Sequence, residues 1–197
     1  MLLWNLLKAK EAYPDVVRWL LVGHSFGGVG AASDAWFYLQ EQGGDYDDTA
    51  VAGVVLLANY LEPSACGPAF NIDFSETDLP MRAIYASNDL IINQTLIEEN
   101  EIYLSKNAVL VAIEGGNHGQ FGSYNDTLRT PILGQIDGEA TITPQEQWDS
   151  TLAAILEVLE MVTTTTAAPA TSNSAWNHHP LTTTAAAMIG ELLLLLL

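Results

Sequence analysis

At 197 residues with 49% apolar content, the chain is long enough for one globular domain with a buried core. Its 24 acidic and 6 basic side chains give a net charge of −18, which repels phosphate backbones and argues against nucleic acid as a partner. The single cysteine, Cys66, excludes an internal disulfide and any cysteine-based metal site.

The first 42 residues predict a helix, a buried strand and a second helix. Apolar residues at 2, 3, 6 and 7 have the spacing of one helix face, so we expect a helix over residues 1–13. The valine-rich apolar run at 16–22 is typical of a strand buried on both faces. Residues 26–42 follow as a helix that a pair of glycines ends.

The middle of the chain repeats this alternation. Apolar runs predict strands over 50–59, 81–86 and 108–113, with a helix over 94–105. The intervening segment 60–79 is loop-like and long enough to form part of a pocket wall. Alternating strands and helices favour a mostly parallel sheet flanked by helices, which is an α/β fold, with functional residues at the C-terminal strand ends.

The C-terminal part predicts an ordered loop, a helix and a tail. Residues 121–141 indicate a loop that packs on the domain or forms a lip over a site, and 143–161 predict a helix that covers the sheet edge. Residues 163–184 are a linker of threonine, alanine and serine, followed by a short apolar segment at 185–197. This end is compatible with a cleaved lipid-anchor signal, and hence a secreted or membrane-anchored protein, or with a disordered tail of a cytoplasmic one.

Ser25 lies between the first buried strand and the helix that follows it. Glycines at 23 and 27 surround it, and such a tight strand-to-helix turn needs small neighbours two positions away on either side. The turn would place the N–H of Phe26 where it can donate to a developing oxyanion. The alternative is a glycine-rich turn in which Ser25 only caps the helix.

A serine nucleophile needs a base and a group that orients the base. His118 is the candidate base, because His24 is expected to point to the opposite side of the turn and the remaining histidines, His178 and His179, lie in the tail. A histidine satisfied by main-chain bonds is the alternative.

Asp89 is the candidate orienting acid, because it follows a strand, precedes a helix and lies between the serine and the histidine in chain order. A helix cap or turn residue is the alternative reading of this position. Two acids of the long loop, Asp73 and Asp78, are held in reserve, whereas Asp126 and Asp137 follow the histidine and break that order.

Three motifs together resemble the α/β-hydrolase superfamily, in particular its small dienelactone-hydrolase-like branch, also called α/β-hydrolase fold-5. They are GHSFGG at 23–28, SND at 87–89 and GGNHGQFGSY at 115–124, and the resemblance spans residues 16–161. It implies Ser25 as nucleophile, His118 as general base and acid, and Asp89 as its orienter. The implied reaction is hydrolysis of a small-molecule ester or similar acyl bond through an acyl-enzyme, with neither a metal nor an organic cofactor.

The family also has strands before the nucleophile strand, and a loop after one of them gives the second oxyanion donor. We expect residues 1–162 to be a hydrolase domain that lacks those strands, as from an incomplete gene model. The alternative function is a catalytically impaired domain that serves as a binding or membrane-tethered module.

Overall fold

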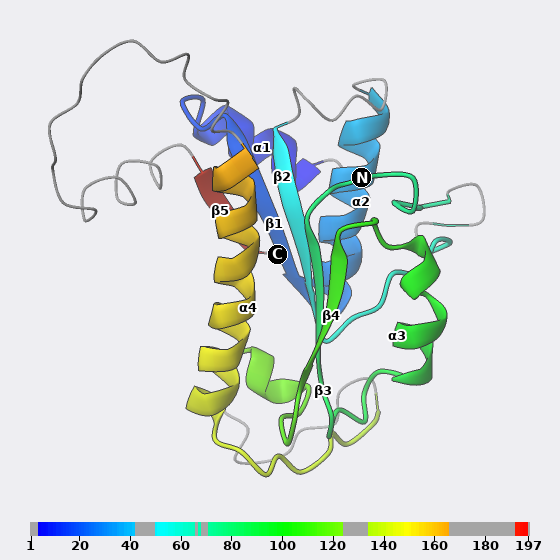
Figure 1. Ribbon diagram of the computed structural model, residues 1–197. Coiled ribbons are helices and arrows are strands. Elements are labelled where there is room, and N and C mark those ends of the chain that lie inside the picture. The colour runs from blue at the N-terminus through cyan, green and yellow to red at the C-terminus, as the bar shows by residue number, and fades with distance from the viewer. Residues whose placement is uncertain are drawn as a thin grey trace, which may run out of the picture.

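A computed structural model describes residues 4–41, 50–65, 67, 71–123, 134–165 and 192–196 of the chain. Strands and helices alternate along it, as the sequence predicts, and Figure 1 shows their arrangement. The helices are α1 (Trp4–Ala12), α2 (Phe26–Glu41), α3 (Thr95–Glu99) and α4 (Pro144–Thr165), with short 3-10 turns η1 (Glu101–Tyr103) and η2 (Gly119–Phe121). The strands are β1 (Arg18–His24), β2 (Val51–Leu57), β3 (Met81–Ala86), β4 (Ala108–Ile113) and β5 (Leu192–Leu196).

The strands form one five-stranded sheet in the order β4-β3-β2-β1-β5. Every neighbouring pair is parallel, and the α/β fold class predicted from the sequence is confirmed. β2 lies in the interior of the sheet, and all of its residues are buried. Buried parallel strands of this kind read as continuous apolar runs, which is why the sequence located them so closely.

Helices cover both faces of the sheet. On one face, Leu6 of α1 and Ala35 of α2 belong to an apolar cluster with Trp19 of β1. On the other face, Val158 of α4 clusters with Ile84 of β3. Figure 1 shows α2 and α4 on opposite sides of the strands, so the sheet is the middle of three layers.

Two helices differ from their prediction. The helix expected over 94–105 is broken, because Asn100, with φ −94° and ψ 2°, leaves the helical conformation between α3 and η1. α4 begins where expected but packs on the face of the sheet, since Ala154 and Val158 bury themselves against strand residues. The expectation that this helix covers the sheet edge was therefore wrong.

At the chain end, β5 pairs with β1 from Arg18 opposite Leu192 to Val22 opposite Leu196. This strand was not expected, because the apolar end is typical of a tail or an anchor signal. Residues 166–191 lie outside the described part of the chain, so most of the expected linker does too.

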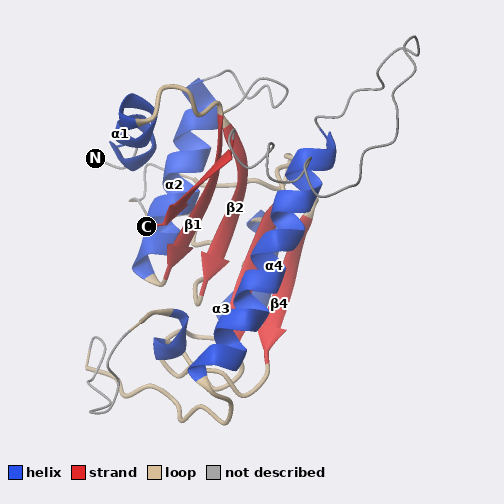
Figure 2. Cartoon of the chain, turned by 90° about the vertical axis from the view of Figure 1, so that its left-hand side faces the viewer, coloured by secondary structure: helices blue, strands red, loops and turns tan. Residues whose placement is uncertain are grey.

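Parallel strands bring their C-terminal ends to one side of the sheet, which we call the C-terminal rim. Figure 2 shows the arrowheads of β1, β2 and β4 pointing the same way. Ser25 follows β1, Asp89 comes three positions after the end of β3, and His118 comes five positions after the end of β4. All three candidate residues therefore lie at this rim, where open parallel sheets place their sites.

Candidate active site

Ser25 is the single residue between β1, which ends at His24, and α2, which begins at Phe26. Its φ of 54° is in the left-handed region, which residues with side chains rarely adopt. Two main-chain hydrogen bonds hold it there: its N–H donates to the carbonyl of Leu57 at 2.8 Å, and its own carbonyl accepts the N–H of Gly28 at 2.9 Å. The strained turn is thus fixed from the strand side and from the helix side.

Gly23 is required by the closeness of this turn. A Cβ at position 23 would overlap the carbonyl oxygen of Gly27 and lie 2.5 Å from the nitrogen of Gly28. Both are main-chain atoms, which cannot rotate out of the way as a side chain can. The glycine therefore has the role that the spacing of the motif predicts.

Phe26 is the first residue of α2, and its side chain is 85% exposed. The N–H groups of the first helical turn have no acceptor within their own helix, and the helix dipole makes this end electropositive. The N–H of Phe26 therefore suits the donor role expected for it beside Ser25.

His118 and Asp89 form a buried hydrogen-bonded pair. Nδ1 of His118 lies 2.8 Å from Oδ2 of Asp89, and each residue exposes only 1% of its surface. Because an ionised carboxylate only accepts hydrogen bonds, it fixes the tautomer in which Nδ1 carries the proton. In this tautomer of the neutral ring, Nε2 is the nitrogen without a proton, which is the one that can act as a base.

The Asp89 carboxylate is held in place by the turn in which it lies. Its second oxygen, Oδ1, accepts the N–H groups of Ile91 at 2.8 Å and Ile92 at 3.1 Å. Nε2 of Gln94 also donates to the carbonyl of Asp89 at 2.9 Å. Asp89 thus closes a turn with Oδ1, as the alternative interpretation of this position proposed, and holds the imidazole of His118 with Oδ2.

His24 lies against His118, so the expectation that it points away was wrong. The two ring centroids are 4.7 Å apart with the rings tilted by 46°, and the ring of Phe121 lies 5.9 Å from that of His24. Burial, and after it the neighbouring His118, lower the pKa of His24 to about 4. His24 therefore presents a neutral ring to His118 at pH 7.

Gln147 of α4, which was not among the expected site residues, holds the loop residue that precedes His118. Its Oε1 accepts the N–H of Asn117 at 3.0 Å, and its Nε2 donates to the carbonyl of Asn117 at 2.9 Å. Gln147 is fully buried on the helix face that also carries Ala154. No sequence signal marked it, because the apolar residues of this helix do not define one face: Leu152 is exposed whereas Ala154 is buried.

The other acids considered have different surroundings. Oδ1 of Asp73 accepts the N–H of Ser75 at 2.9 Å, so this residue closes a turn of its own. Asp78 is exposed, and Asp126 lies outside the described residues. Asp137 contacts the main chain beside the histidine: its Oδ2 accepts the N–H of Gly119 at 2.8 Å.

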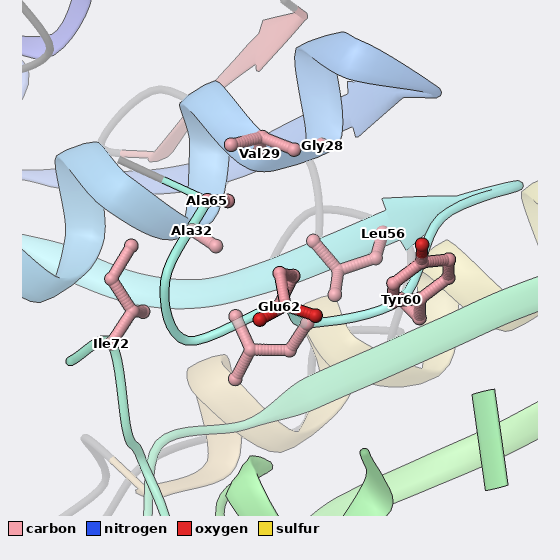
Figure 3. Close-up of a pocket in the computed structure, with 9 residues that line it drawn as sticks. Gly28, Val29, Ala32, Leu56, Tyr60, Glu62, Ala65 and Ile72 are labelled. Atoms are coloured by element: carbon pink, nitrogen blue, oxygen red, sulfur yellow. The ribbon is translucent and has the colours of Figure 1, made fainter. Parts of the chain in front are cut away.

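An open hollow lies beside the first turns of α2 (Figure 3). The segment 60–79, expected to form a pocket wall, contributes part of its lining. The lining is mostly apolar, and the carboxylate of Glu62 and the hydroxyl of Tyr60 are its polar groups in Figure 3. The lining residues are Gly28, Val29, Ala32, Leu56, Tyr60, Leu61, Glu62, Ala65 and Ile72.

Across the described ranges, no group of three or more histidine, cysteine, aspartate or glutamate side chains could hold a metal ion. None of the helices in this part of the chain is both long enough and apolar enough to cross a bilayer. Cys66 lies outside it.

A model of the alpha/beta hydrolase family matches residues 5–149, which include the turn around Ser25 and the Asp89–His118 pair. No curated protein sequence matches the chain significantly.

Two solved structures are similar to the chain. A predicted CIB-like hydrolase from Thermoplasma acidophilum shares 17% identity with this chain at a TM-score of 0.48. The match covers 80% of this chain and 58% of the hydrolase chain. MGS-MChE2, an alpha/beta hydrolase enzyme from a sediment metagenome of the Mar Chica lagoon in Morocco, shares 16% identity at a TM-score of 0.43 and covers 59% of each chain. The chain thus spans less than two thirds of the length of either structure.

Proposed function

Because this chain belongs to the alpha/beta hydrolase family, we propose that it hydrolyses carboxylic esters or similar acyl bonds through Ser25, His118 and Asp89. Ser25 is the nucleophile, His118 the general base and then acid, and Asp89 the residue that orients His118. The substrate is a small molecule with an ester-like carbonyl, and water is the second reactant.

The buried hydrogen bond between His118 and Asp89 carries this proposal. A carboxylate and an imidazole, both with 1% exposure, stay paired at 2.8 Å on loops that follow different strands. The strained turn at Ser25, whose φ is 54°, lies at the same C-terminal rim. Backbone strain and a buried titratable pair at one rim are features that functional sites concentrate.

In the acylation step, Oγ of Ser25 gives its proton to Nε2 of His118 and bonds to the carbonyl carbon of the ester. The carbonyl oxygen becomes an oxyanion, to which the N–H of Phe26 donates. Asp89 stabilises the positive charge that His118 now carries. The intermediate collapses when the ester's alcohol leaves with the proton from His118, and the acyl group stays on Ser25.

In the deacylation step, a water molecule gives a proton to Nε2 of His118 and attacks the acyl carbonyl. The second tetrahedral intermediate breaks the bond to Oγ of Ser25, which takes the proton back from His118, and the carboxylic acid leaves. His24 supports both steps because its lowered pKa, about 4, keeps it uncharged beside the ring that must become positive.

The test is hydrolysis of p-nitrophenyl acetate and butyrate by the full chain, its Ser25→Ala variant and a matched control, Ser150→Ala. Ser150 is exposed on α4, where its hydroxyl bonds only the helix carbonyl of Glu146 in the described contacts. We expect Ser25→Ala to lower kcat by at least about 1,000-fold and Ser150→Ala to leave it unchanged. Equal turnover by all three proteins would contradict the proposal.

A further inference from the structure

The carboxylate of Asp137 joins the two loops that carry Asp89 and His118. Its Oδ1 accepts the N–H of Leu90 at 3.3 Å, and its Oδ2 accepts the N–H of Gly119 at 2.8 Å. Leu90 directly follows Asp89, and Gly119 directly follows His118. One side chain therefore contacts the main chain immediately after both members of the pair.

The residues just before the pair are tied to the same segment. Nδ2 of Asn88 donates to the carbonyl of Glu139 at 2.9 Å, and Nδ2 of Asn117 donates to the carbonyl of Gly138 at 2.8 Å. Gly138 also packs so tightly here that a Cβ would lie 2.9 Å from the carbonyl carbon of Asn88. Residues 137–139 thus bind the neighbours of Asp89 and of His118 on both sides.

We infer that residues 137–139 form a clamp that keeps Asp89 and His118 in hydrogen-bonding register, with Asp137 as its positioning residue. The inference rests on the proposed function, because the pair matters for hydrolysis only if His118 is the base. The two loops follow different strands, so their relative position depends on contacts between them. Moving a catalytic group by about 1 Å can cost on the order of 100-fold in rate.

The clamp requires that both side-chain oxygens of residue 137 accept hydrogen bonds. Oδ1 also accepts the N–H of Gly138 at 2.8 Å, so each oxygen faces at least one N–H group. Asp137→Asn keeps the shape of the side chain but replaces one acceptor by an NH₂ donor, which then faces another donor. The link between the loops is broken while the volume is retained.

The matched control is Glu139→Gln. It also removes one negative charge from the clamp segment, but the Glu139 side chain is exposed and only its main-chain carbonyl takes part in the clamp. Comparing the two variants separates the loss of the clamp from the loss of a nearby charge.

Steady-state hydrolysis of p-nitrophenyl butyrate is measured for the full chain and both variants. We expect Asp137→Asn to lower kcat by about 10- to 100-fold with KM within about twofold, because the register of the base changes and the substrate contacts do not. Glu139→Gln should leave kcat and KM unchanged. Wild-type kcat in Asp137→Asn, or the same loss in both variants, would overturn the clamp.

A second readout does not depend on turnover. The proton on Nδ1 of His118, held by Asp89, gives a low-field resonance in proton NMR, and this signal should weaken or move in Asp137→Asn but not in Glu139→Gln. If the wild-type chain hydrolyses no ester yet the signal responds in this way, the proposed function fails and the clamp stands. An unchanged signal in Asp137→Asn overturns the clamp.

Asn88→Ala keeps the test decisive if Asp137→Asn does not fold. It removes the 2.9 Å bond to the carbonyl of Glu139, together with a long 3.4 Å bond that Oδ1 of Asn88 accepts from the Ser87 hydroxyl, and leaves every carboxylate in place. We expect the same direction of change in kcat and in the His118 signal, by at least about threefold in kcat. Wild-type values for both would overturn the clamp.

Discussion

Replacing Gly23 by alanine should damage the turn at Ser25 more than it damages the fold. The new Cβ would overlap the carbonyl oxygen of Gly27 and lie 2.5 Å from the nitrogen of Gly28, whereas real Cβ contacts essentially never fall below 3.0 Å. The main chain of β1 and of the first turn of α2 must therefore separate by more than about half an ångström. Gly23 and Gly27, which would be pushed apart, lie on either side of the nucleophile Ser25.

Overpacking of this size costs about 1–3 kcal/mol in the free energy of unfolding. The displacement of Ser25 should lower kcat for ester hydrolysis by about 100-fold. Urea denaturation measures the first quantity, and p-nitrophenyl butyrate hydrolysis under native conditions measures the second.

Val22→Ala is the matched control. Val22 is fully buried in the same strand, so losing its methyl groups should also cost about 1–3 kcal/mol, but it leaves the turn intact. We expect wild-type kcat for Val22→Ala and a strong loss for Gly23→Ala at similar stability. Equal kcat values in the two variants would refute the account of the turn.

Three further predictions concern the surroundings of His118. Asp89→Asn should lower kcat by about 10,000-fold, because the amide no longer fixes the tautomer of His118; a loss below tenfold would contradict this. The pKa of His24 is about 4 in the folded chain against 6.5 ordinarily, so the unfolded chain binds more protons between these values and wild-type stability should fall as pH drops from 6.5 to 4. His24→Phe should flatten this dependence in urea denaturation, and an unchanged slope would refute it. Gln147→Leu leaves the main-chain N–H and C=O of Asn117 without their partner and should lower the free energy of unfolding by about 2–5 kcal/mol, measured likewise; wild-type stability would contradict it.

The sequence predicted the sheet closely because buried parallel strands leave apolar runs that need no knowledge of their partners. The runs at 81–86 and 108–113 match β3 and β4 residue for residue. Chain order and strand ends likewise sufficed to place Ser25, Asp89 and His118 at one rim. These inferences depend on local patterns and on the common direction of parallel strands.

What the sequence did not predict depends on contacts between distant segments. His24 was expected on the opposite side of the turn, but in the folded chain its ring lies against that of His118, 94 residues away in the sequence. Asp137 was considered only as a rival acid, since nothing in its neighbours shows that it bonds two loops. β5 was not predicted because it pairs with the side of β1 that β2 does not occupy, and a run of leucines does not indicate such a partner.

The account depends most on the claim that His118 activates the hydroxyl of Ser25. The most direct test is covalent labelling of the full chain with a fluorophosphonate, followed by peptide mass spectrometry, for the wild type and for His118→Gln. We predict one adduct on the peptide that contains Ser25 in the wild type and none in His118→Gln at the same reagent concentration. A folded wild-type chain without an adduct at Ser25, or equal labelling of both proteins, would contradict the claim.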